Sequence, residues 1–391
     1  MNHKPSLILY GAFDRYNYGD NLMPILIEKF YIDKYKDLQS QFNILYASIQ
    51  ESDLTRFSCK PTLPISRLLN VSENSVLMVV GGETMGAHVR NLYLHTFTNE
   101  KQHAYAKFLM KWVKPVYMYL AWKNYPSPWA FPYIPDKKAF LNNVKIVLNT
   151  VGGVPAEKVH PILQDMDYVS VRDERSYQGV KNVVETNLIP DSVLLISKLL
   201  PINELKKHLS PQLEHSFNFN QKYIVVQICP YKSPCSPAIL AKQLLEIKNI
   251  AGIEPVLLPI GYASGHDDVI YLRQVQEESK NKLMLFYDLT VWDIAYFIAS
   301  SKGFYGTSLH GVITALAYGV PHYCLNKNLH KLTSFLDTWS ISPFNLPLDV
   351  TNIYRSLNCT YDVDLLNSKI YDAQKKIENH YDQIYAKCLN I

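Results

Sequence analysis

Several features are absent from this sequence, and each absence excludes a class of protein. The six cysteines form no CxxC pair, and no cysteine or histidine cluster has the spacing of a zinc site. We therefore expect reduced thiols and no metal. No run approaches the ~20 apolar residues of a membrane span, and the first five residues lack the apolar stretch of a signal peptide. These absences predict a cytoplasmic protein.

The chain also has little net charge. A formal charge of +4 spread over 391 residues is too weak to indicate a nucleic-acid partner. No GxGxxG motif follows a predicted strand, so a nicotinamide cofactor is not indicated, and we expect no bound cofactor. Hydrophobic residues make up 48% and charged residues 19%, which is an ordinary globular composition. At this length, two domains are expected rather than one core.

Short apolar runs alternate with helical patterns along the chain. The first half contains one clear helical pattern near 21–35 and five candidate strands, at 6–10, 42–47, 75–80, 144–148 and 168–171. A polar stretch at 200–221 precedes a second series of strands, at 223–228, 256–258, 283–286, 303–305 and 320–323. Helical patterns lie between and after them, at 236–251, 267–280, 291–300 and 310–318.

This order predicts an α/β protein with two Rossmann-like domains and a cleft between them. We expect an N-terminal domain at 1–205, a C-terminal domain at 206–355, and a C-terminal helical segment at 356–391 that packs back on the first domain. In open parallel sheets, ligands bind beyond the carboxyl ends of the strands. Candidate functional residues should therefore follow strands directly.

Two polar loops follow strands in the first half. Asn17 and Asp20 lie in the loop that connects the first strand to the first helix, where they would bond a hydroxyl-rich ligand or cap the helix. Gly81, Gly82 and Glu83 follow a buried strand, where glycine permits close approach of the backbone to a ligand. A plain strand–helix turn is the alternative for this second loop.

Two further motifs carry basic side chains, Arg172 in one and His310 in the other, and a third, Pro190-Asp191, lies between them. Arg172 stands at a strand end, where its guanidinium would bind a carboxylate or phosphate, or form a salt bridge with the next acidic residues. Pro190-Asp191 is more typical of a structural cap. The strongest motif places His310 at a helix start, and five neighbours would complete an anion pocket or cap the helix: Thr307, Ser308, Gly311, Asn326 and Lys331.

Taken in order, these motifs resemble the polysaccharide pyruvyl transferase family over nearly the whole chain. The matching features are Asn17-Tyr-Gly-Asp20, Gly81-Gly82, Val171-Arg172-Asp173 with Ser176, Pro190-Asp191, Leu309-His310-Gly311 with Ala315, and Gly319-Val320-Pro321. The resemblance implies a GT-B-like fold, with the acceptor on the N-terminal domain and the donor on the C-terminal domain. It also implies transfer of the pyruvyl group of phosphoenolpyruvate onto two hydroxyls of a sugar, forming a cyclic ketal in a precursor of a bacterial surface polysaccharide such as a capsule, exopolysaccharide or O-antigen.

The resemblance implies a role for each motif. His310 would be the catalytic histidine, and Arg172 would hold the donor. Our own hypothesis is that His310 acts as an acid. Ser308 departs from the family pattern, because many relatives have arginine at this position. Another cation must then replace that guanidinium, and we expect Lys331 or Arg175 to do so. Asn17, Asp20, Gly81, Gly82 and Glu83 would bind the acceptor.

Two alternatives remain open from the sequence. A GT-B glycosyltransferase that uses a nucleotide sugar would employ the same cleft, with His310 near a diphosphate. A carbohydrate-binding protein without catalysis would keep the fold and would not need His310. Release of phosphate, release of nucleoside diphosphate, or neither would distinguish the three.

The segment Lys107–Tyr133 combines lysines with three of the five tryptophans. Basic and aromatic residues together are typical of a membrane interface, and a lipid-linked acceptor would make such contact useful. The alternative is a packed helix followed by an aromatic, proline-rich loop. The sequence therefore raises peripheral contact with the inner face of the membrane as a hypothesis.

Overall fold

The first parallel sheet is built from the N-terminal half of the chain. The computed structural model describes residues 4–94, 96–97, 100–262 and 267–390, so Met1 to His3, considered above for a signal peptide, lie outside the described residues. The sheet order is β3-β2-β1-β4-β5-β6-β7 and every pairing is parallel. Its strands are β1 (Ser6–Tyr10), β2 (Asn43–Ser48), β3 (Leu63–Pro64), β4 (Val76–Val80), β5 (Lys145–Val151), β6 (Tyr168–Val171) and β7 (Asn187–Leu188).

The second parallel sheet belongs to the C-terminal half, in the order β10-β9-β8-β11-β12. Its strands are β8 (Tyr223–Gln227), β9 (Glu254–Leu257), β10 (Met284–Leu285), β11 (Phe304–Gly306) and β12 (His322–Cys324). In each sheet the strand order reverses beside the first strand of its half. Ligands bind at such switch points, beyond the carboxyl ends of the strands.

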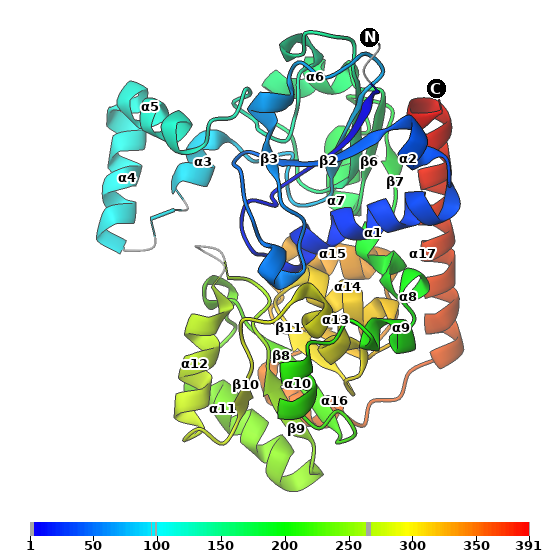
Figure 1. The fold of residues 1–391 in the computed structure, drawn as a ribbon. Helices are drawn as coiled ribbons and strands as arrows, with labels where there is room; N and C mark the ends of the chain where they lie inside the picture. Colours follow the sequence, from blue (N-terminus) through cyan, green and yellow to red (C-terminus); the bar gives the residue numbers. More distant parts are fainter. Residues whose placement is uncertain (1–3, 95, 98–99, 263–266, 391) are drawn as a thin grey trace.

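Helices cover both faces of each sheet (Figure 1). In the first half they are α1 (Tyr18–Lys34), α2 (Leu38–Gln41), α3 (Val89–Leu94), α4 (Glu100–Trp112), α5 (Lys114–Asn124), α6 (His160–Gln164) and α7 (Glu174–Val180). In the second they are α11 (Pro237–Glu246), α12 (Asp268–Glu278), α13 (Val291–Ala299), α14 (Leu309–Ala317) and α15 (His330–Trp339). The two sheets and their helices confirm the predicted pair of Rossmann-like domains.

Alternation along β1 shows why both faces of the first sheet are buried. Leu7 and Leu9 join one hydrophobic cluster, whereas Ile8 and Tyr10 join another on the opposite face. Successive side chains of a strand point to opposite faces, so a continuous apolar run requires cover on both sides. The short edge strands β3 and β7 were not predicted, because two residues carry too little pattern.

Three short helices connect the sheets, and a long one returns. The connecting helices are α8 (Ile196–Leu199), α9 (Ile202–Lys206) and α10 (Pro211–Ser216), and α16 (Ile353–Ser356) precedes the returning helix α17 (Val363–Ile384). Figure 1 shows α17 running alongside both domains to the first sheet. There His380 Nε2 lies 2.8 Å from Asn149 Oδ1, and the Tyr381 hydroxyl donates to Ser192 Oγ at 2.6 Å.

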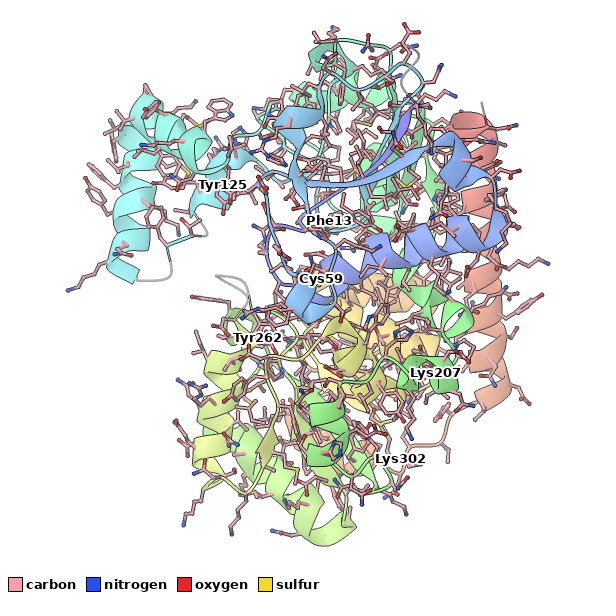
Figure 2. The ribbon with its side chains drawn as sticks, in the orientation of Figure 1. Phe13, Cys59, Tyr125, Lys207, Tyr262 and Lys302 are labelled. Atoms are coloured by element: carbon pink, nitrogen blue, oxygen red, sulfur yellow. The ribbon has the colours of Figure 1, made fainter. Side chains whose placement is uncertain are left out.

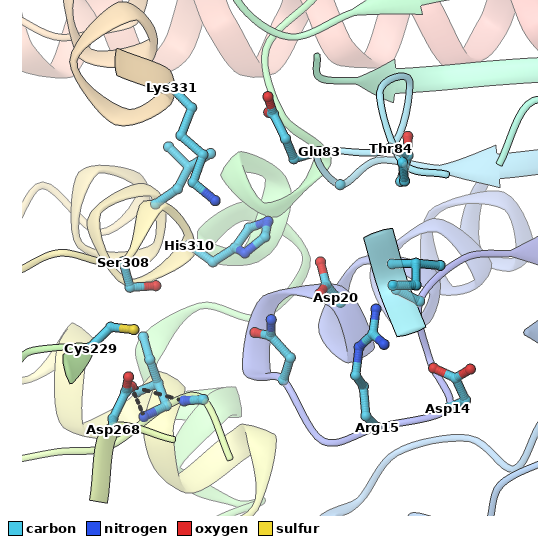
Figure 3. A pocket seen from close by; sticks show the side chains of 18 of the residues that line it. Asp14, Arg15, Asp20, Glu83, Thr84, Cys229, Asp268, Ser308, His310 and Lys331 are labelled. Carbon is cyan, nitrogen blue, oxygen red and sulfur yellow. Dashed lines mark hydrogen bonds between the residues drawn. The ribbon is translucent and has the colours of Figure 1, made fainter. Parts of the chain in front are cut away.

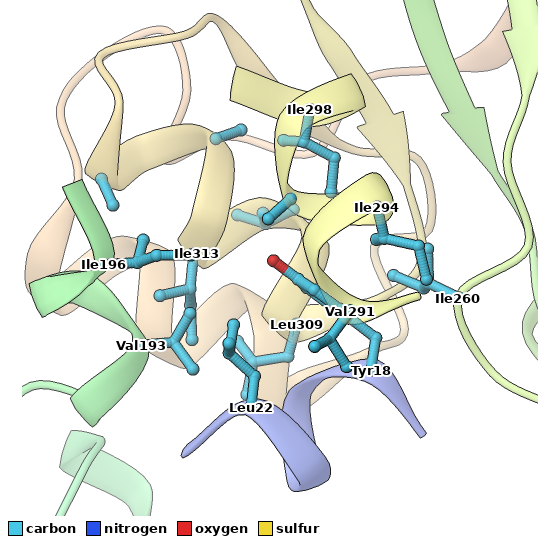
Figure 4. Close-up of a cluster of buried hydrophobic side chains, with 14 of the residues drawn as sticks. Tyr18, Leu22, Val193, Ile196, Ile260, Val291, Ile294, Ile298, Leu309 and Ile313 are labelled. Atoms are coloured by element: carbon cyan, nitrogen blue, oxygen red, sulfur yellow. The ribbon is translucent and has the colours of Figure 1, made fainter. Parts of the chain in front are cut away.

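The domains meet through apolar and polar contacts between α1 and the C-terminal half. Tyr18 and Leu22 of α1 pack among Leu309 and Ile313 of α14 (Figure 4). The Tyr18 hydroxyl lies 2.8 Å from Thr314 Oγ1, and its backbone N–H donates to the Ile260 carbonyl at 3.0 Å. One hydrophobic cluster therefore extends through both domains, which fixes their relative position.

Aromatic stacking extends this junction toward the front of the molecule. The Tyr16 ring stacks on Phe57 at 3.9 Å between centroids and on Tyr262 of the other domain at 5.2 Å. Cys59 and Tyr262 mark the two sides of the junction in Figure 2. The Tyr16 hydroxyl also donates to the Leu289 carbonyl at 2.6 Å. The contacts of Tyr16 with Tyr262 and Leu289 join the two domains, and the Phe57 ring holds Tyr16 in place from its own domain.

The part of the chain that the structure describes contains no helix long and apolar enough to span a membrane.

Candidate functional site

A cavity of about 440 Å³ lies between the domains, beyond the carboxyl ends of β1, β4, β8 and β11. The loops that follow these four strands supply much of its wall. Figure 3 shows His310, Lys331 and Ser308 on one side, with Asp14, Arg15 and Asp20 opposite. The predicted site residues that line it are Asn17, Asp20, Gly82, Glu83, Arg172, Thr307, Ser308, His310 and Lys331. Residues from both halves of the chain thus share one cavity.

His310 stands in the first turn of α14, and the helix start is fixed by Ser308. The Ser308 hydroxyl accepts from the Gly311 backbone N–H at 3.4 Å, so this serine is the N-cap. The imidazole lies directly against Gly19 of α1, because a Cβ added there would fall 1.9 Å from His310 Cγ. His310 is 9% exposed, and its Nε2 is buried with no hydrogen-bond partner. An imidazole held this way is available to a ligand.

Arg172 follows β6 and is 1% exposed. Its Nη1 donates to Asp191 Oδ2 at 3.0 Å and its Nη2 to Glu83 Oε2 at 3.4 Å. Burial would lower the pKa of Arg172, but the negative charges of Asp191 and Glu83 outweigh burial and raise this pKa above its ordinary value. The guanidinium therefore stays charged. Its salt bridges are to these two carboxylates, not to the neighbouring acids that the sequence offered as alternatives. Its Nε is buried without a partner.

Asp191 links the two principal candidates. The same oxygen, Oδ2, that accepts from Arg172 lies 3.7 Å from His310 Nε2. Burial would raise the pKa of Asp191, but His310 and Arg172 lower it to about 2. The carboxylate is therefore ionised and would stabilise a proton held on the imidazole. The cap predicted for this residue is present, because its Oδ1 accepts from the Val193 N–H at 3.0 Å. The contacts with Arg172 and His310 are a second role that the sequence did not indicate.

Two lysines add positive charge to the cavity. Lys331 lies in the first turn of α15, and Lys232 follows β8. Burial, together with the neighbouring charges of Lys232 and Arg172, lowers the pKa of Lys331 to about 8. The opposing carboxylates that act on it are Glu83 and Asp20. A buried lysine whose charge is disfavoured by neighbouring cations is a natural site for an anion, because the anion relieves that repulsion.

Arg175, the other expected cation, does not line the cavity. Its guanidinium bonds to Glu83. Burial would raise the pKa of Glu83, but Arg172 and Arg175 outweigh it and lower the pKa. Of the two cations expected to compensate for Ser308, the structure therefore brings only Lys331 into the cavity.

The remaining predicted residues have mainly structural surroundings. Gly81 has a φ of +54°, and a Cβ there would meet Met23 Sδ at 2.3 Å. A Cβ on Gly311 would meet Phe304 at 2.2 Å. Asn326 donates to the Lys232 carbonyl at 2.9 Å and, like these two glycines, lies outside the cavity lining. Close packing explains the glycines, and Asn326 supports the Lys232 segment.

The loop after β1 brings an unpredicted polar group to the opposite wall. Asp14 and Arg15 line the cavity with Tyr133, and both Asp14 carboxylate oxygens and the Tyr133 hydroxyl are buried without hydrogen-bond partners. Burial raises the pKa of Asp14. Burial would lower the pKa of Arg15, but Tyr133 and Asp14 raise it. Asn17, not Asp20, stands at the N-cap of α1, so Asp20 is left to face the cavity. These unsatisfied groups are able to bond a hydroxyl-rich ligand.

Among the residues that the structure describes, no group of three or more His, Cys, Asp or Glu side chains could hold a metal ion.

The family model for polysaccharide pyruvyl transferase matches residues 7–327. The chain belongs to the polysaccharide pyruvyl transferase family. The match covers both sheets and every predicted site residue except Lys331, which lies four residues beyond its end. No curated protein sequence matches the chain significantly.

Solved structures similar to this transferase include GT-B UDP-GlcNAc 2-epimerases. The enzyme of Methanocaldococcus jannaschii, in complex with UDP-GlcNAc and UDP, is 10% identical with a TM-score of 0.54, covering 96% of this chain and 99% of that one. The enzyme of Neisseria meningitidis, bound to UDP-GlcNAc, is 11% identical with a TM-score of 0.52, covering 97% and 100%. The S. aureus MnaA–UDP co-structure is 12% identical with a TM-score of 0.51, covering 98% of this chain and 97% of that one. At this identity the likeness shows the fold alone.

Several residues at or beside this cavity were not predicted as site residues from the sequence, for different reasons. Asp191 was noted as part of a motif, but nothing local indicates that it meets a residue 119 positions later. Asp14 and Arg15 lie inside the glycine-containing loop after β1, where two adjacent charges were a usable signal. Asp268 gave none: it is buried at the start of α12 and accepts from Gln227 Nε2 and the Ile260 and Gly261 N–H groups at 2.8–3.0 Å.

Proposed function

We propose that this protein transfers the pyruvyl group of phosphoenolpyruvate onto two hydroxyls of a sugar, releasing phosphate and forming a cyclic ketal. The sugar would belong to a surface-polysaccharide precursor. The observation that carries the proposal is the chain Arg172–Asp191–His310, in which one buried carboxylate oxygen approaches both a guanidinium and an imidazole beside a cavity that Lys232 and Lys331 also line. Family membership supplies the reaction class.

The cationic wall supports a small, strongly anionic donor. Phosphoenolpyruvate carries a carboxylate and a phosphate, and these groups require fixed positive charge. We assign Lys331 and Arg172 to the donor, with Thr307 and Ser308 at the start of α14 beside it. The helix N-terminus adds its partial positive charge at the same place. Lys331 then takes the place of the guanidinium that the family pattern puts at position 308.

His310 would act as the acid. A proton moves from the imidazole to the methylene carbon of the donor, and the adjacent carbon becomes oxocarbenium-like. The first sugar hydroxyl attacks that carbon and returns its proton to His310. Phosphate then leaves, the second hydroxyl closes the ketal, and its proton leaves with the phosphate. Asp191 stabilises the imidazole whenever it carries the proton, before the first transfer and after the proton returns, and is thus a positioning residue. General acid help of this kind is worth ~10²–10⁴-fold in rate.

The opposite wall would hold the acceptor. Asp20, Asn17 and Gly82 face the cavity there, together with Asp14 and Arg15. Glu83 is already engaged by Arg172 and Arg175, so we assign it to holding Arg172 rather than to binding sugar. Hydroxyl-rich ligands need both donors and acceptors, and the buried, unpartnered carboxylate of Asp14 provides the acceptors.

Two incubations test this function. The purified protein is mixed with phosphoenolpyruvate and a panel of methyl glycosides that carry a free 4,6- or 3,4-diol, or with nucleotide sugars and the same panel. We expect phosphate release that depends on both donor and glycoside, with the mass of a ketal in the product. Release of nucleoside diphosphate from a nucleotide sugar, without reaction of phosphoenolpyruvate, would overturn the proposal in favour of glycosyl transfer.

A further inference from the structure

Helices α4 and α5 form a hairpin, residues 100–124, that stands away from the rest of the molecule (Figure 1). It is held by a small separate cluster around Leu94, Ala106 and Tyr117 rather than by the large cores. The Tyr117 hydroxyl donates to the Arg90 carbonyl at 2.9 Å, which ties α5 to α3. The hairpin therefore has its own anchor and presents much of its surface outward.

Large apolar side chains cover that outward surface. On α4, Tyr105, Phe108 and Trp112 are 64%, 54% and 68% exposed, and their spacing puts them on one face of the helix. On the following turn and α5, the exposed apolar residues are Val113, Val116, Tyr119 and Trp122. Isolated exposed apolar residues are ordinary, but a cluster of this size marks an interaction surface.

Apart from Glu100 at its first position, the hairpin carries charge of one sign. Residues 101–135 contain no aspartate, glutamate or arginine, and they contain five lysines, Lys101, Lys107, Lys111, Lys114 and Lys123. Lys111 Nζ lies 5.2 Å from the centre of the Trp112 ring, so cation and aromatic surface are directly adjacent. The rest of the chain is nearly balanced, with a net formal charge of +4 overall. The segment thus concentrates the positive charge of the protein.

We propose that this hairpin binds the surface of an anionic lipid bilayer, with its aromatic side chains in the interface and its lysines at the headgroups. Interfacial helices combine these two residue types because each amphipathic side chain has an apolar stem and a polar tip. A protein partner fits less well, since protein interfaces are depleted in lysine and enriched in arginine at their cores. Lysine spread among exposed aromatics fits lipid instead.

The position of the hairpin gives this contact a use. Leu92 of α3, Thr96 shortly after it, and Tyr125, which follows the end of α5, line the cavity between the domains. A bilayer held by the hairpin therefore lies next to the mouth through which an acceptor would enter. Binding to lipid does not depend on the identity of the donor, whereas delivery of a lipid-linked sugar rests on the proposed function.

Vesicle sedimentation without any substrate tests the lipid contact. Vesicles of phosphatidylcholine alone are compared with vesicles containing about one third phosphatidylglycerol, at low and high salt. We expect the protein to pellet with the anionic vesicles at low salt and to be released by salt. Tryptophan emission should shift to the blue on binding, because Trp112 leaves water.

Matched variants locate the contact. Lys107→Gln/Lys111→Gln should weaken binding about 25-fold, at about fivefold for each lysine. Phe108→Ser/Trp112→Ser should weaken it about tenfold or more. The control Lys369→Gln/Lys375→Gln removes two exposed lysines from α17, and Tyr371→Ser removes an exposed aromatic there; both should bind as the wild type does.

Three results would overturn the proposal: no pelleting with anionic vesicles, equal binding by the hairpin variants, or concentration-dependent dimerisation that needs Trp112 and occurs without lipid. The phosphate-release assay with water-soluble methyl glycosides separates this failure from failure of the proposed function. A protein that transfers pyruvyl groups but ignores vesicles refutes only the lipid contact, and a protein that binds vesicles but never consumes phosphoenolpyruvate refutes only the chemistry.

Discussion

Gly19 and His310 face each other across the domain junction with no room for a side chain between them. A Cβ added to Gly19 would fall 1.9 Å from His310 Cγ and 2.0 Å from its Nδ1. The first helix of one domain thus sets the position of the imidazole that begins a helix of the other. The glycine of the Asn-Tyr-Gly-Asp motif is explained by this contact, because any side chain at position 19 would occupy the space of the imidazole.

Gly19→Ala should abolish most activity while the protein stays folded. The added methyl group displaces the imidazole from Asp191, and a displacement of about 1 Å at a catalytic group costs ~10²-fold in rate. The measurement is kcat/KM for phosphate release, with far-UV circular dichroism to confirm folding. Gly179→Ala in α7, where the nearest atoms to an added Cβ belong to the Val154 side chain at 3.1–3.5 Å, is the control and should keep activity. Equal activity of both variants would contradict the assigned position of His310.

His310→Gln should remove the acid but not the donor site. We expect phosphate release to fall ~10²–10⁴-fold, while phosphoenolpyruvate still binds, because glutamine keeps polarity but cannot deliver the proton. Rates come from the phosphate assay and binding from calorimetry. His330→Gln, an exposed histidine at the start of α15, serves as control and should behave as the wild type does. Retained turnover in His310→Gln would exclude the acid role.

Lys331 should make donor affinity depend on pH. Its pKa is lowered to about 8 by burial and by the nearby Lys232 and Arg172. The side chain is a cation below that value and neutral above it, so phosphoenolpyruvate should bind tightly below pH 8. Its affinity should weaken as the pH rises further, by up to about tenfold per unit. Calorimetric titrations between about pH 6.5 and pH 9.5 measure this.

The matched variant is Lys331→Arg, whose guanidinium stays charged throughout this range. Its donor affinity should be flat across the same pH window. A wild-type affinity that does not change between pH 7 and pH 9.5 would show that Lys331 does not contact the donor.

Ser308→Arg should restore the donor site when Lys331 is removed. Lys331→Ala alone should weaken phosphoenolpyruvate binding at least about tenfold, as loss of a charge-assisted bond does. Adding Ser308→Arg supplies a guanidinium at the cavity wall and should recover much of that loss. It also removes the N-cap of α14, so stability should fall by about 1 kcal/mol. Calorimetry and thermal unfolding measure the two effects, and a double variant no better than Lys331→Ala would refute the compensation.

Asp191→Asn should destabilise the protein and flatten its acid response. At neutral pH the buried Arg172 loses its principal partner, which costs about 3–5 kcal/mol of unfolding free energy. In the wild type the pKa of Asp191 is lowered to about 2, so its stabilising contribution is present above the unfolded value near 4. That contribution is lost as the pH falls toward 2. Urea unfolding at pH 7, 4.5 and 3 measures both effects.

Asp372→Asn, at an exposed position of α17, is the control and should change neither quantity. If Asp191→Asn has the same free energy of unfolding as the wild type at neutral pH, the buried ion pair between Asp191 and Arg172 does not stabilise the protein as proposed.

Local patterns were sufficient for the two-domain fold. Continuous apolar runs such as Val76–Val80 predict buried parallel strands, because both faces must be covered. The helix α14 was also predictable, since its apolar pattern begins at Leu309 and its end is marked by a glycine with a φ of +68° at position 319. The two-residue strands β3 and β7 lacked any such pattern.

The sequence by itself determined which residues stand in the loops after strands, and so which residues reach the cavity: Asn17, Gly82, Arg172 and His310 all follow this rule. Strand ends are set by local periodicity, which a sequence displays directly.

Only the tertiary structure decided their partners. Asp191 joins Arg172 to His310, Gly19 receives the imidazole, and Arg175 turns to Glu83 and leaves Lys331 in the cavity. These pairings depend on how α1 and α14 pack across the junction between domains. Packing between segments some 290 residues apart leaves no trace in the spacing of neighbouring residues.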